Sequence, residues 1–176
     1  MSTIVSFNPI ADQSAQTLIL GSMPGVLSLN ASQYYAHPRN AFWHIMASIY
    51  GFDAEIPYAH RAEALKASQV ALWDVLHSCV RQGSLDSAIE AGSRVSNDFQ
   101  SFFSDYPNIK LVGFNGSEAE KSFRLFVLPK LSVTNIKFVR LPSTSPAHTV
   151  HLEKKIEAWR TALTVQNTSF KVNLKN

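Results

Sequence analysis

Four short apolar runs are spaced along the chain, and each has the pattern of a strand buried on both faces. They cover residues 17–20, 69–76, 109–114 and 136–141. The runs are too short for typical helices, and three of them end directly before Gly, Asn or Pro. Short apolar runs bounded by such residues favour buried strands over helices. We therefore expect a sheet whose strands are covered on both sides.

Amphipathic segments alternate with these runs and predict helices over residues 40–51, 61–68, 96–106, 117–128 and 149–163. Asn40 is the expected N-cap of the first helix, Gly51 its stop, and Ser96 the expected start of the third. Buried strands that alternate with helices indicate an α/β sandwich with a mostly parallel sheet.

The most unusual local sequences directly follow the predicted strands. They are the turn at residues 21–25 (GSMPG), the Trp73–Asp74 pair, and the loops at residues 114–117 (FNGS) and 141–148 (LPSTSPAH). Ligands of parallel sheets bind outside the carboxyl ends of the strands, where such loops gather. Their position is the first indication of a functional site.

Composition narrows the class of protein. The chain has 176 residues, of which 45% are hydrophobic and 16% charged, as expected for one globular domain over residues 1–176 with polar residues 168–176 prone to fraying. The net charge of +3 permits binding to a phosphate backbone without requiring it. One cysteine, Cys79, excludes an internal disulfide and a Cys-rich zinc site. No membrane span or signal-peptide pattern is evident, so we expect a soluble, cytoplasmic protein.

The turn at residues 21–25 can bring backbone amides close to a ligand, because two of its five positions are glycine. It matches neither a Walker loop nor a dinucleotide fingerprint. Met23 stands where a nucleophile elbow would have its serine. A tight strand-to-helix turn explains the motif equally well.

Two further loops carry polar side chains suited to nucleic acid. Ser143, Thr144 and Ser145 offer hydroxyls on a stiff loop, which suits phosphate contacts, and Leu141 at its base could act as an apolar wedge in a DNA stack. The alternative is a helix lead-in with capping hydroxyls. The amide of Asn115 suits the edge of a nucleobase, whereas the alternative is an ordinary Asn-Gly turn.

Four histidines and one carboxylate lie in or near these loops and are candidates for metal binding or catalysis. His148 and His151 lie three positions apart, and His37 and His44 lie near the proposed site. The spacing lacks the third ligand that zinc hydrolases use, so we expect no metal. Asp74 at the end of a strand could serve as a base or could cap the following helix, and both readings stay open.

The stretch YYAHPRNAFW, residues 34–43, surrounds the polar residues His37, Pro38, Arg39 and Asn40 with four aromatic side chains. It is a poor helix because proline lacks an amide donor, and a poor strand because apolar and polar positions do not alternate. Irregular loops of this kind often carry function, although a surface turn that plugs the core edge is the alternative.

Residues 18–43, 71–76, 112–119 and 141–148 together resemble the uracil-DNA glycosylase superfamily, and within it the hypoxanthine-DNA (deoxyinosine) glycosylase branch. The resemblance implies a three-layer α/β/α sandwich around a central four-stranded parallel sheet. It implies a monomeric, monofunctional glycosylase without cofactor or metal. Such an enzyme flips a deaminated base out of double- or single-stranded DNA and hydrolyses its glycosidic bond, as a step of base excision repair.

The resemblance also assigns roles to residues. It makes Asn40 the catalytic amide that orients the attacking water, and the amides of the 21–25 turn stabilisers of the leaving base. The expected base pocket comprises Gly21, Ser22, Met23, Pro24, Tyr35, Phe42, Phe114 and Asn115. The expected DNA-binding residues are Leu141, Ser143, Thr144, Ser145, Pro146, His148 and Arg39.

Two positions depart from related patterns. Met23 replaces the Asn that mismatch-specific glycosylases carry in this turn, and His148 stands where the branch is expected to have Asn. Inosine and uracil both remain possible substrates on this reading. A uracil-specific enzyme, a catalytically silent DNA-binding module and a nucleoside hydrolase are the alternatives; the apolar wedge expected at Leu141 argues against the last.

Overall fold

A computed structural model describes residues 2–133 and 135–169 of the chain. Its centre is a four-stranded parallel sheet in the order β3-β2-β6-β7. The strands are β2 (Thr17–Gly21), β3 (Val70–Asp74), β6 (Leu111–Asn115) and β7 (Lys137–Leu141). All four lie within the runs expected to form strands or extend them by one residue.

Both faces of β2, β3 and β6 are largely buried, as their apolar sequence predicts, whereas in the edge strand β7 only Leu141 is buried and the prediction of a buried strand is wrong there. In β2, Leu18 and Leu20 pack into one hydrophobic cluster and Ile19 between them packs into the other. Because successive side chains of a strand point to opposite faces, one apolar run supplies both cores.

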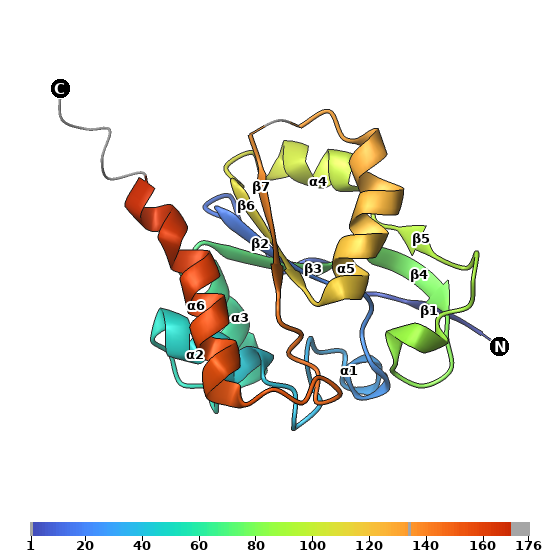
Figure 1. The fold of residues 1–176 in the computed structure, drawn as a ribbon, viewed down its shortest axis with the longest axis horizontal. Coiled ribbons are helices and arrows are strands. Elements are labelled where there is room, and N and C mark those ends of the chain that lie inside the picture. The colour runs from blue at the N-terminus through green and yellow to red at the C-terminus, as the bar shows by residue number, and fades with distance from the viewer. Residues whose placement is uncertain (1, 134, 170–176) are drawn as a thin grey trace.

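Helices cover the two faces in separate groups (Figure 1). One face carries α2 (Phe42–Tyr50), α3 (Tyr58–Ala67) and α6 (Leu152–Ser169), whose buried residues join the cluster around Ile19. The other carries α4 (Phe99–Asp105) and α5 (Ser117–Ser122), and α5 continues as a π-helical segment, Phe123–Val127, and a 3₁₀ turn, Leu128–Lys130. The three-layer α/β/α sandwich is confirmed.

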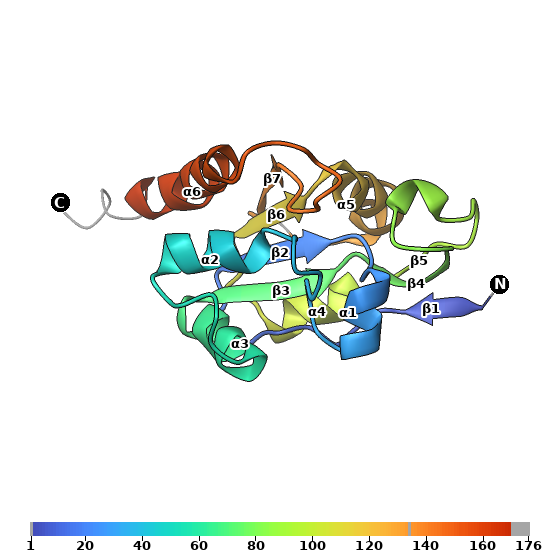
Figure 2. The same cartoon turned by 90° about the horizontal axis from the view of Figure 1, so that it is seen from below.

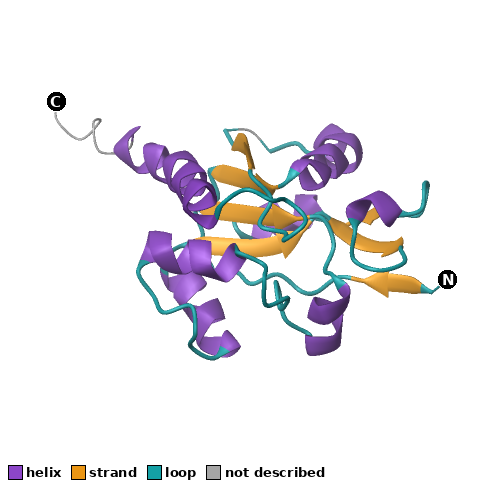
Figure 3. Ribbon diagram, turned by 60° about the horizontal axis from the view of Figure 1, so that its bottom comes forward, coloured by secondary structure: helices purple, strands orange, loops and turns teal. Residues whose placement is uncertain are grey.

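A second, antiparallel sheet was missed from the sequence. It has the order β1-β4-β5 and consists of β1 (Thr3–Val5), β4 (Leu76–Val80) and β5 (Val95–Ser96). It extends from the end of β3 away from α6 (Figures 2 and 3). The predicted strand over residues 69–76 is in fact the end of one sheet and the beginning of the other. The short helix α1 (Val26–Ala31) and the 3₁₀ turn Asp86–Ala88 were also missed.

Several predicted helix starts need correction, since α2 starts at Phe42 and α3 at Tyr58 rather than at residues 40 and 61. Ser96 does not open α4, because it pairs in β5; the cap is Asp98, whose carboxylate accepts a hydrogen bond from the Ser101 amide. The last helix starts at Leu152, later than predicted, and continues to Ser169. Of the expected frayed tail, residues 170–176 lie outside the described residues. Within the described part of the chain, no helix is long and apolar enough to cross a membrane.

Candidate active site

The register of the parallel sheet brings the ends of its four strands together. Gly21 lies opposite Asp74, and Asn115 lies opposite Leu141. Beyond these ends is a cavity of about 550 Å³. Twelve of the sixteen predicted site residues line it, namely Gly21, Ser22, Met23, Pro24, Tyr35, Asn40, Asn115, Ser143, Thr144, Ser145, Pro146 and His148. The loops singled out from the sequence therefore do surround one hollow.

Asn40 is held at this cavity by hydrogen bonds along its own loop. Its amide donates to the carbonyl of His37 at 2.9 Å, and its side-chain oxygen accepts from the amide of Phe42 at 3.0 Å. The latter bond lies directly before α2, whose N-cap is Ala41 and not Asn40 as predicted. The next residue, Ala41, donates to the carbonyl of Thr144 at 3.0 Å and so ties this loop to the 142–148 loop.

Tyr35 forms a wall of the cavity through an uncommon backbone conformation. Its φ angle is 55°, in the left-handed region that non-glycine residues seldom adopt. Its ring stacks on Phe42 with centroids 4.1 Å apart, and its hydroxyl accepts a hydrogen bond from Asn115 at 3.0 Å. These contacts hold the side chain in place against the local backbone cost.

Asn115 acts as a brace between loops. Its Nδ2 group donates to Tyr35 and to the Thr144 hydroxyl (2.9 Å), and its Oδ1 accepts from the Thr144 amide (2.9 Å). Thr144 is accordingly only 1% exposed. Its hydroxyl accepts a hydrogen bond inside the protein, so the contact of Thr144 with a phosphate stays a prediction, whereas Ser143 and Ser145 are partly exposed.

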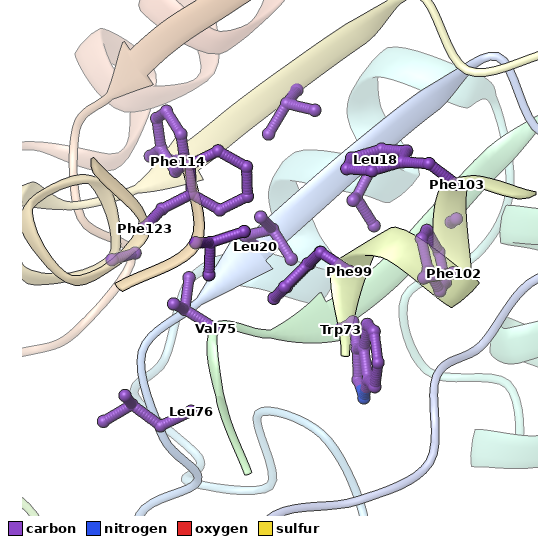
Figure 4. Packing of buried hydrophobic residues seen from close by; sticks show 14 of the residues in the cluster. Leu18, Leu20, Trp73, Val75, Leu76, Phe99, Phe102, Phe103, Phe114 and Phe123 are labelled. Atoms are coloured by element: carbon purple, nitrogen blue, oxygen red, sulfur yellow. The ribbon is translucent and has the colours of Figure 1, made fainter. Parts of the chain in front are cut away.

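Three apolar residues expected at the site belong to the core instead. Leu141 is 1% exposed, and its Cδ1 would lie 2.7 Å from a Cβ added at Gly113, so it packs on the sheet and cannot act as a wedge. Phe114 faces the opposite core, with its ring 5.2 Å from that of Phe123 (Figure 4). Phe42 is fully buried behind Tyr35 and supports the wall without lining the cavity.

Arg39 lies outside the main cavity, in an adjoining hollow of about 320 Å³. This hollow also contains His44 and Lys155, and it shares Asn40 and His148 with the main cavity. Asn40 thus lies where the main cavity meets a smaller hollow that contains more basic residues.

Helix α6 holds the 142–148 loop in place. The sequence did not indicate these contacts. The indole of Trp159, fully buried, donates to the carbonyl of Pro142 at 2.8 Å. The ammonium group of Lys155 donates to the carbonyl of Ser145 at 3.3 Å. The loop is therefore held from the helix that follows it as well as by Asn115.

The 21–25 turn requires glycine at its first position. A Cβ at Gly21 would lie 2.5 Å from Oδ1 of Asp74 and 2.9 Å from the hydroxyl of Tyr35. The far side of the turn is fixed by Arg81, which donates to the carbonyl of Pro24. Close packing of this kind excludes any side chain at residue 21.

A polar network missed from the sequence supports the same turn. The Ser22 hydroxyl donates to Asp86 at 2.7 Å, and the Arg81 guanidinium lies 3.8 Å from the same carboxylate. Burial raises the pKa of Asp86, while Ser22 and Arg81 lower it. Burial, together with the charge of Asp86, raises the pKa of Asp74 to about 7 against the effect of Arg81. Residues 81 and 86 lie in a loop between strands, and no local pattern pointed to them.

No three His, Cys, Asp or Glu side chains come together as a metal site within the described residues. Cys79 is buried.

The chain belongs to the uracil DNA glycosylase superfamily, whose family model matches residues 8–164. It is similar to the hypoxanthine DNA glycosylase of Methanosarcina barkeri, with 36% identity over 89% of this chain and 95% of that protein. It is 33% identical to the hypoxanthine DNA glycosylase of Methanosarcina acetivorans over 75% of this chain and 88% of that one. A solution NMR structure of a candidate uracil DNA glycosylase from M. acetivorans superposes with a TM-score of 0.75 at 28% identity, covering 92% of this chain and 99% of that one.

Proposed function

We propose that this protein is a monofunctional DNA glycosylase that removes hypoxanthine from deoxyinosine in DNA, as a step of base excision repair. Family membership and two relatives named hypoxanthine DNA glycosylases support the reaction class and the leading substrate. The observation that carries the proposal is the cavity at the carboxyl ends of the parallel strands, which Asn40 shares with the 21–25 turn and the 143–148 loop.

The size and position of the cavity suit a flipped base. A base inside the duplex is inaccessible, so the enzyme must extrude it into a pocket. The cavity of about 550 Å³ has room for a purine. Tyr35 lines one side of it, and the ends of the strands line its base. The adjoining hollow with Arg39, His44 and Lys155 would then receive the phosphate backbone.

The hydrolysis step is assigned to Asn40. Its side-chain oxygen already accepts one hydrogen bond from Phe42, and a second lone pair can accept from a water molecule that attacks the sugar. Orientation of that water suits a reaction whose transition state resembles an oxocarbenium ion. No lysine lines the main cavity within the described residues, which favours water over an amine as the nucleophile.

The direct test is release of free base. Duplexes that carry one deoxyinosine, one deoxyuridine or neither would be incubated with the protein, and the released base identified by chromatography. Hypoxanthine from the first duplex alone supports the proposal, and release of uracil as well adds a second substrate. Release of uracil alone would overturn the substrate, and release of neither base with retained DNA binding would indicate a silent binding module.

Free deoxyinosine serves as the control for a nucleoside hydrolase. A glycosylase that needs the strand leaves it intact, because the outer hollow then has no phosphate backbone to bind. We further propose that the protein acts as a monomer in the cytoplasm; sedimentation in the presence and absence of DNA tests the first part.

A further inference from the structure

Asp74 is an ionisable group in the cavity that the proposed reaction has not yet used. It ends β3, is 3% exposed and lines the main cavity. Its Oδ2 is buried and has no hydrogen-bond partner among the described residues, and its Oδ1 lies over Gly21. A buried, unpartnered carboxyl oxygen costs free energy, so such a group in a cavity suggests an absent ligand.

The surroundings of Asp74 favour its neutral form. The ionisable groups around it come from two connecting segments and α3, and they are Tyr34, Tyr35, Tyr58, Arg81 and Asp86. The one cation among them, Arg81, donates hydrogen bonds to the carbonyls of Gly83 and Pro24 and forms an ion pair with Asp86. Burial and the charge of Asp86 raise the pKa of Asp74 to about 7. The group can therefore hold a proton near neutral pH.

Asp74 and Asn40 occupy different depths of the cavity. Asn40 is partly exposed and is shared with the outer hollow that contains Arg39 and His44. Asp74 lines only the main cavity and is almost completely buried. If the sugar meets Asn40 at the junction, the base extends inward, toward Asp74.

We propose that Asp74 is a general acid that donates its proton to a ring nitrogen or carbonyl oxygen of the leaving base. This inference rests on the proposed function. Its chemistry differs from the stabilisation by backbone amides at the 21–25 turn, because a proton is transferred. A purine leaves more readily as a neutral molecule than as an anion, and acid catalysis of this kind accelerates reactions by about 100-fold or more.

The step balances without a further reactant. The bond between C1′ and the base nitrogen breaks, and its electron pair goes to the base, which takes the proton of Asp74. Water oriented by Asn40 forms the new bond to C1′ and loses one proton. That proton returns to the Asp74 carboxylate through solvent, so one water is consumed and the enzyme is restored.

The test is the pH dependence of single-turnover excision from a deoxyinosine duplex between about pH 5.5 and 8.5. For the wild type, we expect a rate constant that is constant below about pH 7 and falls tenfold for each further pH unit. Asp74→Asn keeps the shape of the side chain but has no proton to transfer. We expect its rate at pH 6 to be about 100-fold lower and independent of pH.

Two further variants separate catalysis from structure. Asp105→Asn removes an exposed carboxylate outside the cavity and should leave the profile unchanged. Asp86→Asn removes the charge that raises the pKa of Asp74, so the fall in rate should begin at a lower pH. This second variant tests the inference even where Asp74→Asn folds poorly.

Three results would overturn the inference while leaving the glycosylase intact. They are a profile of Asp74→Asn that still falls above pH 7, a fall that does not move in Asp86→Asn, and a wild-type rate that rises with pH, as an ionised Asp74 acting as base would give. Absence of hypoxanthine release from the wild type at every pH would instead overturn the proposed function, and the inference with it.

Discussion

Replacement of Asp74 by Asn should make the protein more stable at pH 8 and hardly change its stability at pH 4. The carboxyl group has a pKa of about 7 in the folded protein, against an ordinary value of 3.8 that applies to the unfolded chain. Well below pH 4, both states are protonated; at pH 4 the unfolded chain has already released part of this proton, which lowers stability by only about 0.5 kcal/mol. As the pH rises toward 7, the unfolded chain releases this proton while the folded protein keeps it, so stability falls.

The magnitude follows from the two pKa values. The interval from 3.8 to about 7 corresponds to roughly 4 kcal/mol of lost stability above pH 7, which is an upper bound because a buried site can relax. Asparagine carries no charge at any of these pH values and therefore avoids this loss. The difference in free energy of unfolding between variant and wild type should grow from near zero at pH 4 to as much as about 4 kcal/mol at pH 8.

Urea unfolding followed by tryptophan fluorescence at pH 4, 6 and 8 measures this difference. The exposed Asp105→Asn variant provides the matched control, for which a difference near zero is expected throughout. A difference for Asp74→Asn that is the same at all three pH values would refute the reasoning. So would a variant that is less stable than the wild type at pH 8.

Three other substitutions test the structure of the site. Leu141→Ala should lower the free energy of unfolding by about 2 to 5 kcal/mol, since it removes a buried core side chain. Unchanged stability with weakened DNA binding would instead support insertion of Leu141 into the DNA stack. Gly21→Ala should impair both stability, by about 1 to 3 kcal/mol, and base excision, because its Cβ would collide with Asp74; thermal unfolding and the excision assay check this. Trp159→Phe should cost about 1 to 3 kcal/mol by leaving the carbonyl of Pro142 without its donor, and should increase protease cleavage within the 142–148 loop; an unchanged cleavage pattern would show that α6 does not hold it.

Local sequence predicted the central sheet well because each of its strands carries a strong local signal. The apolar runs of β2, β3 and β6 are largely buried on both faces, which strands between two helical layers allow, whereas the edge strand β7 is only partly buried. The location of the site followed from the same topology, since parallel strands must end at one edge. The second sheet escaped notice because its strands are short and their partners are far apart in sequence.

The errors at the site have two causes, side-chain direction and contacts between residues far apart in the sequence. Leu141 ends β7 and Phe114 precedes the last residue of β6, but each side chain points into a core. The hydroxyl of Thr144 suits a phosphate contact but accepts a hydrogen bond from Asn115. The two residues are 29 positions apart, so no local pattern predicts this bond. The Arg81–Asp86 pair escaped for the same reason, because only the fold brings it to the turn at Ser22.

The role of Asn40 tests the account most directly. Single-turnover excision of hypoxanthine would be measured for the wild type, for Asn40→Ala and for Asn40→Ser, whose hydroxyl can still accept the hydrogen bond of the Phe42 amide. We expect both variants to lose excision by about 100-fold or more, although only the alanine variant loses the hydrogen bond to the Phe42 amide, worth about 0.5 to 2 kcal/mol of stability. Excision by a folded Asn40→Ala variant at the wild-type rate would contradict it.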